Sequence, residues 1–261
     1  MDKEFVPNRG SEREQSRIAD IFQLVPGAGQ RAIDIGARDG YLSKRLAERF
    51  DSVVALDLER PRIDDPRITC VAGDLTSLEF ADHHFDFVLC SEVLEHIPPG
   101  LLPKACAELV RVTGGSVLIG VPYRQDLLCG RTTCQTCGRS NPPYGHVNAF
   151  DEATLSGLFA ELAWTRSSFV DSVQSFSNPL SVALLDFASN PFGTYDQEEP
   201  CVHCGGAIGS PGPRTLSQRI ATRMAVAILE MQGMFVKPHA AWIHVLFERA
   251  GKPLSGKRDR Q

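Results

Sequence analysis

Two Cys-x-x-Cys-Gly segments, about sixty residues apart, are the part of this sequence best suited to bind a metal ion. Their thiol groups belong to Cys134, Cys137, Cys201 and Cys204. Each segment points two thiolates at one centre, and two segments complete the tetrahedral four-sulfur site of a structural zinc ion. The sequence therefore predicts bound Zn²⁺, with a redox-active pair or unrelated free thiols as alternatives. Three further side chains are candidate substitutes for one ligand: Cys129, His146 and His203.

A second set of residues combines a glycine-containing turn with acidic side chains that follow apolar runs. Its members are Asp34, Gly36, Gly40, Asp57, Asp74, Ser91 and Glu92. Glycine at a turn lets a ligand approach the backbone without meeting a Cβ atom. Asp57 is placed to accept hydrogen bonds from two ribose hydroxyls, and Asp74 to accept one from an adenine amino group while Leu75 packs on the ring. These types in this order favour a site for a nucleoside-containing cofactor.

The elements that must position these residues are short apolar strands that alternate with amphipathic helices. We expect strands at 31–36, 52–57, 68–72, 85–90, 116–121, 164–173 and 241–249. Helices are expected at 17–24, 41–50, 150–162, 216–235 and from about 103. This alternation predicts an α/β fold: a Rossmann-like, doubly wound, mainly parallel sheet of about seven strands with a C-terminal cysteine-rich insertion. In such sheets ligands bind beyond the carboxyl ends of the strands, where the acids lie.

Three regions follow from this pattern. Residues 1–125 are expected to form the cofactor-binding core, 126–240 a substrate-side region with the zinc-stabilised insertion, and 241–261 a closing strand and a disordered basic tail. Residues 175–213 are expected to be irregular. The helix at 216–235 carries an apolar stripe that we expect to face the core rather than a partner. The stripe consists of Leu216, Ile220, Met224, Ile228, Met231 and Phe235.

The net charge of −5 and the pI near 5.8 argue against a nucleic-acid partner, because binding to a phosphate backbone calls for a basic face. Residues 1–16 lack the apolar run of a signal peptide, and the longest mostly apolar stretch, 224–236, is too short to cross a bilayer. We therefore expect a cytoplasmic protein whose cysteines bind metal rather than form disulfides. Cys70, Cys90 and Cys106 fall on expected core faces.

Five segments together resemble the class I methyltransferases that use S-adenosylmethionine (SAM), in particular the type 11 and ubiquinone-biosynthesis group. They are DIGARDGYLS (34–43), VVALDLE (53–59), AGDLTSLEF (72–80), FDFVLCSEVLEHIP (85–98) and ELVRVTGGSVLIGVP (108–122). By this resemblance Asp34, Gly36 and Gly40 hold the amino-acid moiety of SAM and shape the turn. Asp57, with its neighbour Leu58, is placed at the ribose, and Asp74 with Leu75 at the adenine. Ser91 and Glu92 line the floor of the site.

The turn departs from the family's usual Asp-x-Gly-x-Gly-x-Gly at one position, where Arg38 replaces the middle glycine. Arg38 is a candidate to reach the methionyl carboxylate. A dinucleotide site would want Gly-x-Gly-x-x-Gly to seat a pyrophosphate, and the chain lacks that pattern and a Tyr-x-x-x-Lys pair. SAM, which has no pyrophosphate, fits the turn better.

The resemblance implies a methyltransferase. The insertion, as a dedicated pocket, and the acidic net charge favour a small molecule, a lipid-linked intermediate or a cell-envelope sugar as the acceptor over a long RNA. The alternatives are a non-catalytic scaffold that binds SAM and zinc, and an NAD(P)-dependent oxidoreductase. An oxygen or carbon acceptor calls for a base, for which His96 and His146 are the first candidates, followed by Glu95 and Tyr123. The segment NPPY at 141–144 matches a motif of amino-methyltransferases but lies far from the fourth strand, so we expect a turn there.

Overall fold

The computed structural model describes residues 11–250, and these divide into two compact units. The first unit takes in the chain up to Tyr123, Phe150–Asp171 and the chain from Ala241. The second unit consists of Arg124–Ala149 and Ser172–Ala240. The predicted basic tail lies outside the described residues. The second unit is thus built from two insertions into the chain of the first.

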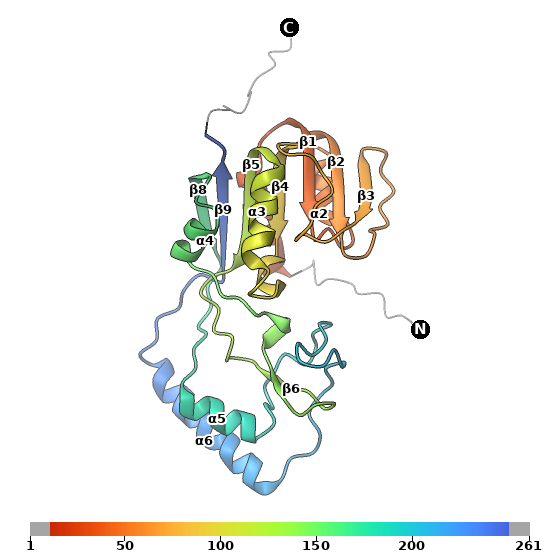
Figure 1. Cartoon of the computed structure of the whole chain (residues 1–261). Coiled ribbons are helices and arrows are strands. Elements are labelled where there is room, and N and C mark those ends of the chain that lie inside the picture. The colour runs from red at the N-terminus through yellow and green to blue at the C-terminus, as the bar shows by residue number, and fades with distance from the viewer. Residues whose placement is uncertain (1–10, 251–261) are drawn as a thin grey trace. The chain divides into compact units, whose positions relative to one another are not determined.

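A seven-stranded sheet with the order β3-β2-β1-β4-β5-β9-β8 forms the centre of the first unit (Figure 1). Its strands are β1 (Gly29–Ile35), β2 (Phe50–Asp57), β3 (Ile68–Ala72), β4 (Phe85–Ser91), β5 (Thr113–Pro122), β8 (Ala163–Val170) and β9 (Trp242–Glu248). The strands from β3 to β5 pair in parallel, and β9 runs antiparallel between β5 and β8. The predicted Rossmann-like, mainly parallel sheet of about seven strands is confirmed.

Helices cover both faces of this sheet, as expected for parallel strands that are apolar on both sides. The four helices of the unit are α1 (Glu12–Leu24), α2 (Tyr41–Leu46), α3 (Leu102–Val112) and α4 (Glu152–Leu158). Side chains of α1 and α2 share one core cluster with the strands, in which Ile21 and Leu46 are fully buried. Helix α3 lies in front of the strands in Figure 1, and its apolar stripe at Cys106 and Leu109 is buried.

The second unit contains a short hairpin, two helices and long connecting loops. Its elements are β6 (Thr132–Thr133), β7 (Ser140–Asn141), the 3₁₀ helix η2 (Pro143–Gly145), α5 (Pro179–Phe187) and α6 (Leu216–Gly233). The expectation that 175–213 is irregular is wrong for α5. This helix begins with a capping box in which Asn178 and Ser181 bond each other's backbone, and Pro179 occupies the first turn. No described helix is both long and apolar enough to cross a membrane.

The stripe predicted to bury α6 in a core lies instead on the outside of the helix. Leu216 is 74% exposed, Met231 59% and Phe235 82%. The buried residues of α6 are small, Ala221, Thr222 and Ala225, and α6 contacts α5. The prediction of a core-facing stripe is therefore wrong, because small residues rather than large ones make the helix contact.

Candidate functional site

The loops that follow β1 and β2 are joined by backbone hydrogen bonds. The N–H groups of Gly36 and Ala37 donate to the carbonyl of Leu56, at 2.8 and 3.1 Å. The carboxylate of Asp57 accepts the N–H of Arg38 at 2.9 Å on one oxygen and its neighbour Leu58 at 2.7 Å on the other. A carboxylate has about four acceptor positions, so Asp57 retains capacity for two more donors.

The loop after β3 joins the same edge of the sheet. Asp57 pairs in register with Ala72, and its carbonyl accepts the N–H of Gly73 at 2.8 Å. Asp74, one residue on, accepts the N–H of Thr76 at 2.7 Å, and this bond holds the pKa of the Asp74 carboxyl below its ordinary value. The structure therefore brings the two predicted acids to adjacent strand ends.

The two leucines of the predicted set differ in accessibility. Leu75 is 4% exposed, whereas Leu58 is 76% exposed. A side chain that protein atoms already cover has little surface left for a ligand. Leu58 is thus better placed than Leu75 to pack against a bound ring.

The turn between β1 and α2 requires glycine at two positions. Gly36 and Gly40 have φ angles of +75° and +74°, in the left-handed region that L-residues avoid. A Cβ atom on Gly36 would lie 2.5 Å from a methyl group of Val93, and one on Gly40 would lie 2.2 Å from Ile63. Arg38 also has a positive φ of 45°, which costs a residue with a Cβ roughly 1–2 kcal/mol.

A buried cation of α1 bonds the end of β4, and the sequence prediction did not identify it as part of the site. Arg17 of α1 is 7% exposed, and its guanidinium donates to the hydroxyl of Ser91 at 3.0 Å. Glu92 accepts the indole N–H of Trp242 at 3.2 Å. Arg17 follows the helical spacing of Ile21 and Leu24 on the buried stripe of α1. The sequence signal that could have identified Arg17 is its position, as a cation, in a helical stripe that is otherwise apolar.

Arg17 forms an ion pair with Glu14 at 2.8 Å, and two buried carboxyl groups, Glu92 and Glu95, also lie close to it. Burial raises the pKa of both buried groups. Glu95 is fully buried, and neither of its oxygens bonds another described residue. Burial, with a smaller contribution from Glu92, raises the pKa of Glu95 well above its usual range. Burial also raises the pKa of Glu92, and the positive charge of Arg17 opposes that rise. Arg17 is thus the cation that partly balances these acids.

Asp34 lies inside the sheet at the end of β1. It is 2% exposed, and the hydroxyl of Ser43 donates to its carboxylate at 2.6 Å. Burial outweighs this hydrogen bond and raises the pKa of Asp34 to about 7. Its charge therefore depends on pH near neutrality.

We predict that Asp34 makes the folded protein less stable as the pH rises. The carboxyl pKa is about 4 in an unfolded chain and about 7 in the folded one, so its protonated form favours folding below pH 4. That contribution is lost as the pH rises through 7. In Asp34→Asn the corresponding fall in the free energy of unfolding should be absent. Urea titrations of both proteins between pH 5 and 8 measure the free energy of unfolding at each pH. The same dependence of that free energy on pH in both proteins would contradict the prediction.

The two histidines predicted as bases lie in different units. His96 ends a 3₁₀ helix, η1 (Leu94–His96), in the first unit. His146 is buried in the second unit, where its Nδ1 lies 2.6 Å from the side-chain oxygen of Gln125. The hydroxyl of Tyr123 donates to Glu152 at 2.9 Å. His146 and Tyr123 thus each have a hydrogen-bond partner, Gln125 and Glu152.

The NPPY segment forms a turn, as predicted. Its tyrosine, Tyr144, has a φ of 54° within η2. The side chain of Asn141 is buried and accepts the backbone N–H of Val202 at 2.8 Å. Asn141 therefore ties the first cysteine segment to the second.

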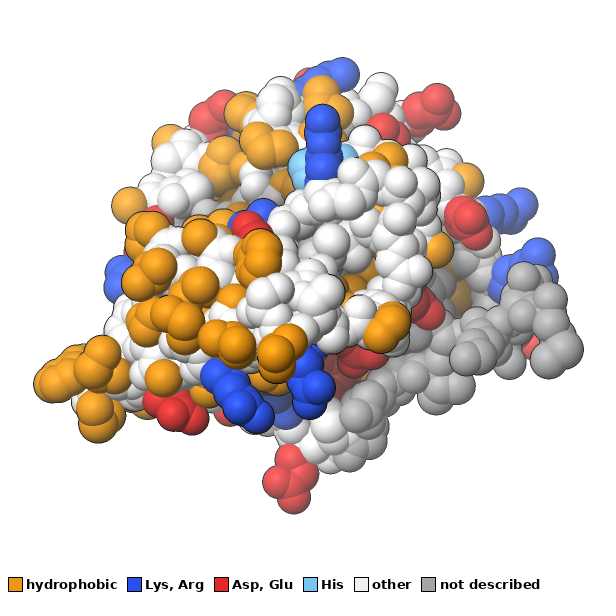
Figure 2. Space-filling model, turned by 90° about the horizontal axis from the view of Figure 1, so that it is seen from below, with side chains coloured by type: hydrophobic (Ala, Val, Ile, Leu, Met, Phe, Trp, Pro, Cys, Tyr) orange, Lys and Arg blue, Asp and Glu red, His pale blue; other side chains and the backbone are white. Residues whose placement is uncertain are grey.

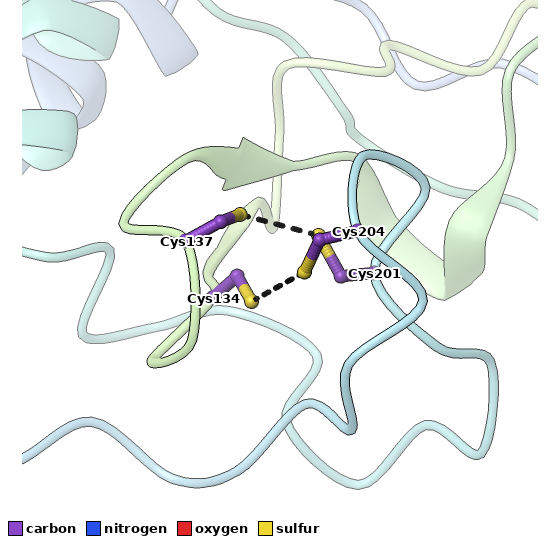
Figure 3. Close-up of side chains that lie close together, drawn as sticks. All are labelled: Cys134, Cys137, Cys201 and Cys204. Atoms are coloured by element: carbon purple, nitrogen blue, oxygen red, sulfur yellow. Dashed lines mark hydrogen bonds between the residues drawn. The ribbon is translucent and has the colours of Figure 1, made fainter.

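All four cysteines of the two Cys-x-x-Cys segments converge on one centre (Figure 3). The sulfur of Cys134 lies 3.7 Å from that of Cys204, and the sulfur of Cys137 lies 3.8 Å from that of Cys201. All four sulfurs lie within 4.8 Å of one another, and none forms a disulfide. A tetrahedron of sulfurs around zinc, with bonds of about 2.3 Å, has edges of about 3.8 Å. The donor set and its spacing therefore fit zinc.

Both cysteine segments have the same backbone geometry. The carbonyl of Cys134 accepts the N–H of Gly138 at 2.8 Å, and Gly138 has a φ of +72°. The carbonyl of Cys201 accepts the N–H of Gly205 at 2.8 Å, and Gly205 has a φ of +69°. The repeated turn orients two thiols inward from each segment.

The thiols of this cluster have perturbed acidity. Backbone N–H groups, first that of Cys137, lower the pKa of Cys134 to about 6, so this sulfur is a thiolate at neutral pH. A backbone N–H from Gly206 acts in the same direction on Cys204, but burial and the three neighbouring thiols outweigh it and raise the pKa to about 12. A divalent cation would favour the thiolate form at every position, because thiolates are its ligands.

The remaining cysteines and the possible substitute ligands lie outside this cluster. Cys90 and Cys106 are buried and Cys70 packs against the core, as predicted. Cys129 is exposed. One ring nitrogen of His203 lies 3.0 Å from the carbonyl of Ser140.

Comparison with known proteins identifies the class of the first unit. Residues 33–119 match a family described as a methyltransferase domain. A demethylmenaquinone methyltransferase of Renibacterium salmoninarum is 37% identical over 122 residues, which are 44% of this chain and 50% of the relative. A ubiquinone biosynthesis O-methyltransferase of Stutzerimonas stutzeri is 31% identical over 120 residues, 41% and 51% of the two chains. The chain thus spans about half the length of these curated relatives.

Solved structures show the same fold at low sequence identity. The YcgJ protein of Bacillus subtilis aligns with a TM-score of 0.52 and 14% identity, over 91% of this chain and 99% of the other. The N-methyltransferase NodS of Bradyrhizobium japonicum, solved with S-adenosyl-l-homocysteine, aligns with a TM-score of 0.51 and 16% identity, over 92% and 88%. The family match at residues 33–119 and the curated relatives agree with the class I SAM-dependent methyltransferase domain that the motifs predict, and the solved structures agree with its fold.

Proposed function

We propose that this chain is an enzyme that transfers the methyl group of SAM to a small molecule, a lipid-linked intermediate or a cell-envelope sugar. The observation that carries the proposal is the position of Asp57. Its carboxylate ends β2, is oriented by the N–H groups of Arg38 and Leu58, and retains acceptor capacity for two hydroxyl groups. A pair of ribose hydroxyls matches that capacity.

The other cofactor contacts are assigned from the same edge of the sheet. Gly36 and Gly40, both at positive φ, shape the turn that we assign to the amino-acid moiety. Asp34, which accepts the hydroxyl of Ser43, is assigned to the same moiety. The exposed carboxylate of Asp74 is assigned to the adenine amino group, and the exposed Leu58 is assigned to packing on the ring in preference to the buried Leu75. Arg38 is assigned to the methionyl carboxylate. Ser91 and Glu92 form the floor, where Arg17 and Trp242 hold their side chains.

When bound, SAM supplies an electrophilic methyl group on a sulfonium centre. The protein's own contribution is to hold donor and acceptor in line and to exclude water, which lowers the entropic part of the barrier. An oxygen or carbon acceptor also needs a base to take its proton. His96 and His146 are proposed for that role.

Replacement of the working base by alanine should lower the rate of methyl transfer about 10²-fold or more, because a positioned base contributes 10²–10⁴. We expect this of His96→Ala or His146→Ala, with unchanged affinity for SAM. The measurement is the initial rate of label transfer with each variant, and His83→Ala is a control histidine whose ring bonds the carbonyl of Thr113. Unchanged rates in both variants would rule out both histidines as the base.

We also propose that Cys134, Cys137, Cys201 and Cys204 hold one structural zinc ion. Four thiolates leave no coordination position for water or substrate, so such an ion stabilises the fold and takes no part in methyl transfer. The sulfur spacing and the thiolate character of Cys134 support this assignment.

We assign binding of the methyl acceptor to residues 126–240 rather than to the segment that matches the methyltransferase family. The match to the methyltransferase domain ends at residue 119, before the second unit begins. The relatives named above act on demethylmenaquinone and in ubiquinone biosynthesis, which supports a lipid-linked acceptor among the three classes. Their similarity covers less than half of this chain.

Labelled-methyl transfer from SAM into fractionated cell extract tests the function. Wild-type protein should place label in a small-molecule, lipid or glycan fraction, and Asp57→Ala should not. Label in protein or RNA fractions would overturn the proposed acceptor class. SAM binding without label in any fraction would instead favour a non-catalytic scaffold.

A further inference from the structure

Helix α6 exposes four large apolar side chains on one side, and its buried residues are small. Leu216, Ile220, Met224 and Met231 lie along one side at helical spacing and are 74%, 51%, 52% and 59% exposed. The opposite side, which includes Ala225, is buried. A helix stabilised only by its own unit would bury the larger residues, because their burial contributes more free energy.

Further apolar side chains of the second unit are exposed in the same way. Leu180 and Phe187 of α5 are 58% and 59% exposed, and α5 contacts α6. Met234 and Phe235, which follow the last turn of α6, are 74% and 82% exposed. Figure 2 shows hydrophobic side chains gathered on the face that it views, with side chains of the Lys and Arg class beside them. We call these residues of α5, α6 and 234–235 the apolar face.

Positive charge borders the apolar face. Residues 214–237 contain four cations, Arg214, Arg219, Arg223 and Lys237, and one carboxylate, Glu230. The stretch thus carries a net charge of +3 in a chain whose net charge is −5. Arg219 and Arg223 are exposed, and neither forms an ion pair with another described residue. These two arginines are available to an anionic partner.

We propose that the apolar face binds the surface of an anionic lipid bilayer, with α6 lying in the plane of the interface. An exposed stripe of Leu, Ile, Met and Phe suits the boundary between headgroups and acyl chains. Arg219 and Arg223 at its edge suit anionic headgroups, which attract each nearby cation. The 18 residues of α6 do not form a membrane-spanning helix, so the mode of binding is peripheral.

The charge distinguishes a lipid surface from a second copy of this chain. A two-fold symmetric contact repeats the same patch on both sides. Counting residues 214–237 of each copy, it would gather eight cations around two carboxylates, one Glu230 from each, and Asp186 of α5 is already paired with Arg131. An anionic bilayer neutralises that excess instead of doubling it. The surface therefore favours lipid, and self-association is the competing outcome of the test.

Vesicle flotation with the full chain tests this proposal. The probes are vesicles of phosphatidylcholine alone and of phosphatidylcholine mixed with phosphatidylglycerol. Wild-type protein should float with the mixed vesicles, bind pure phosphatidylcholine more weakly, and lose the difference as salt is raised. The variant Ile220→Glu/Met224→Glu/Met231→Glu should lose binding to both. Its changes are at exposed positions, so its circular dichroism should match that of wild type.

A second variant separates charge from apolar contact. Arg219→Glu/Arg223→Glu should weaken binding to the mixed vesicles by about 25-fold or more, roughly fivefold for each cation removed. Leu101→Glu and Lys44→Glu, exposed positions of the first unit, are the matched controls and should bind as wild type does.

Three results would overturn the proposal. The first is that wild-type protein does not float with mixed vesicles. The second is that wild type and the triple glutamate variant float equally. The third is that wild type is a dimer by light scattering, whereas the triple variant is a monomer. The last result would assign the apolar face to contact between copies. None of these readouts depends on methyl transfer.

Discussion

Replacement of Asp57 by alanine is expected to weaken SAM binding by at least a hundredfold. The substitution removes the carboxylate that would accept two ribose hydroxyls, and a hydrogen bond to a charged group contributes about 1.5–3 kcal/mol. Two such bonds amount to about 3 kcal/mol or more, which is about 150-fold in affinity. The same change frees the N–H groups of Arg38 and Leu58, so the loops after β1 and β2 lose their shared anchor. Equilibrium dialysis with labelled SAM measures the loss.

Two controls make this prediction specific. Asp51→Ala removes an exposed carboxylate from the other end of β2 and should leave SAM affinity unchanged. Asp57→Asn keeps one acceptor oxygen and should fall between alanine and wild type. Equal SAM affinity in wild type and Asp57→Ala would remove Asp57 from the site. Equal losses for Asp51→Ala and Asp57→Ala would point to a general effect on the fold.

Replacement of Cys134 by serine is expected to abolish zinc binding and to disorder the second unit. Structural zinc in small domains contributes about 10–16 kcal/mol to the folded state, which is as large as the stability of about 5–15 kcal/mol that a whole domain usually has. The second unit has only short strands and small buried residues around the cluster, so it has little else to hold the two cysteine segments together. Elemental analysis should give about one zinc per wild-type chain and near zero for the variant.

Limited proteolysis then locates the structural change. Cleavage of Cys134→Ser should concentrate in Arg124–Ala149 and Ser172–Ala240, while the seven-stranded sheet remains protected. Cys129→Ser alters an exposed thiol outside the cluster and serves as the control. Wild-type protein purified without chelator that contains no zinc would contradict the assignment. So would full zinc content in Cys134→Ser.

The strands and the site loops of the first unit could be predicted because local pattern and global fold agree there. Each of the five parallel strands, β1 to β5, contains a short apolar run, and the acids of the set lie at or just after the ends of these runs. Parallel strands bring their carboxyl ends to one edge, so sequence order alone placed Asp57 beside the loop of Asp74. The convergence of the four cysteines followed from ligand spacing in the same way.

Two features could not be predicted from pattern alone. The stripe of α6 has the period of a core-facing helix, but a period does not show which side faces the protein. The small residues Ala221 and Ala225 take the inner side because they let α6 approach α5 closely. The role of Arg17 required tertiary structure, since its partner Ser91 lies 74 residues away in the chain.

Calorimetric titration of the full chain with SAM shows whether Gly36, Asp57 and Asp74 line a SAM site. We expect saturable binding of about one SAM per chain, competition by S-adenosylhomocysteine, and no heat with NAD or NADP. Binding of a nicotinamide dinucleotide in place of SAM, or no heat with any of these ligands, would contradict the assignment of Gly36, Asp57 and Asp74 to a SAM site.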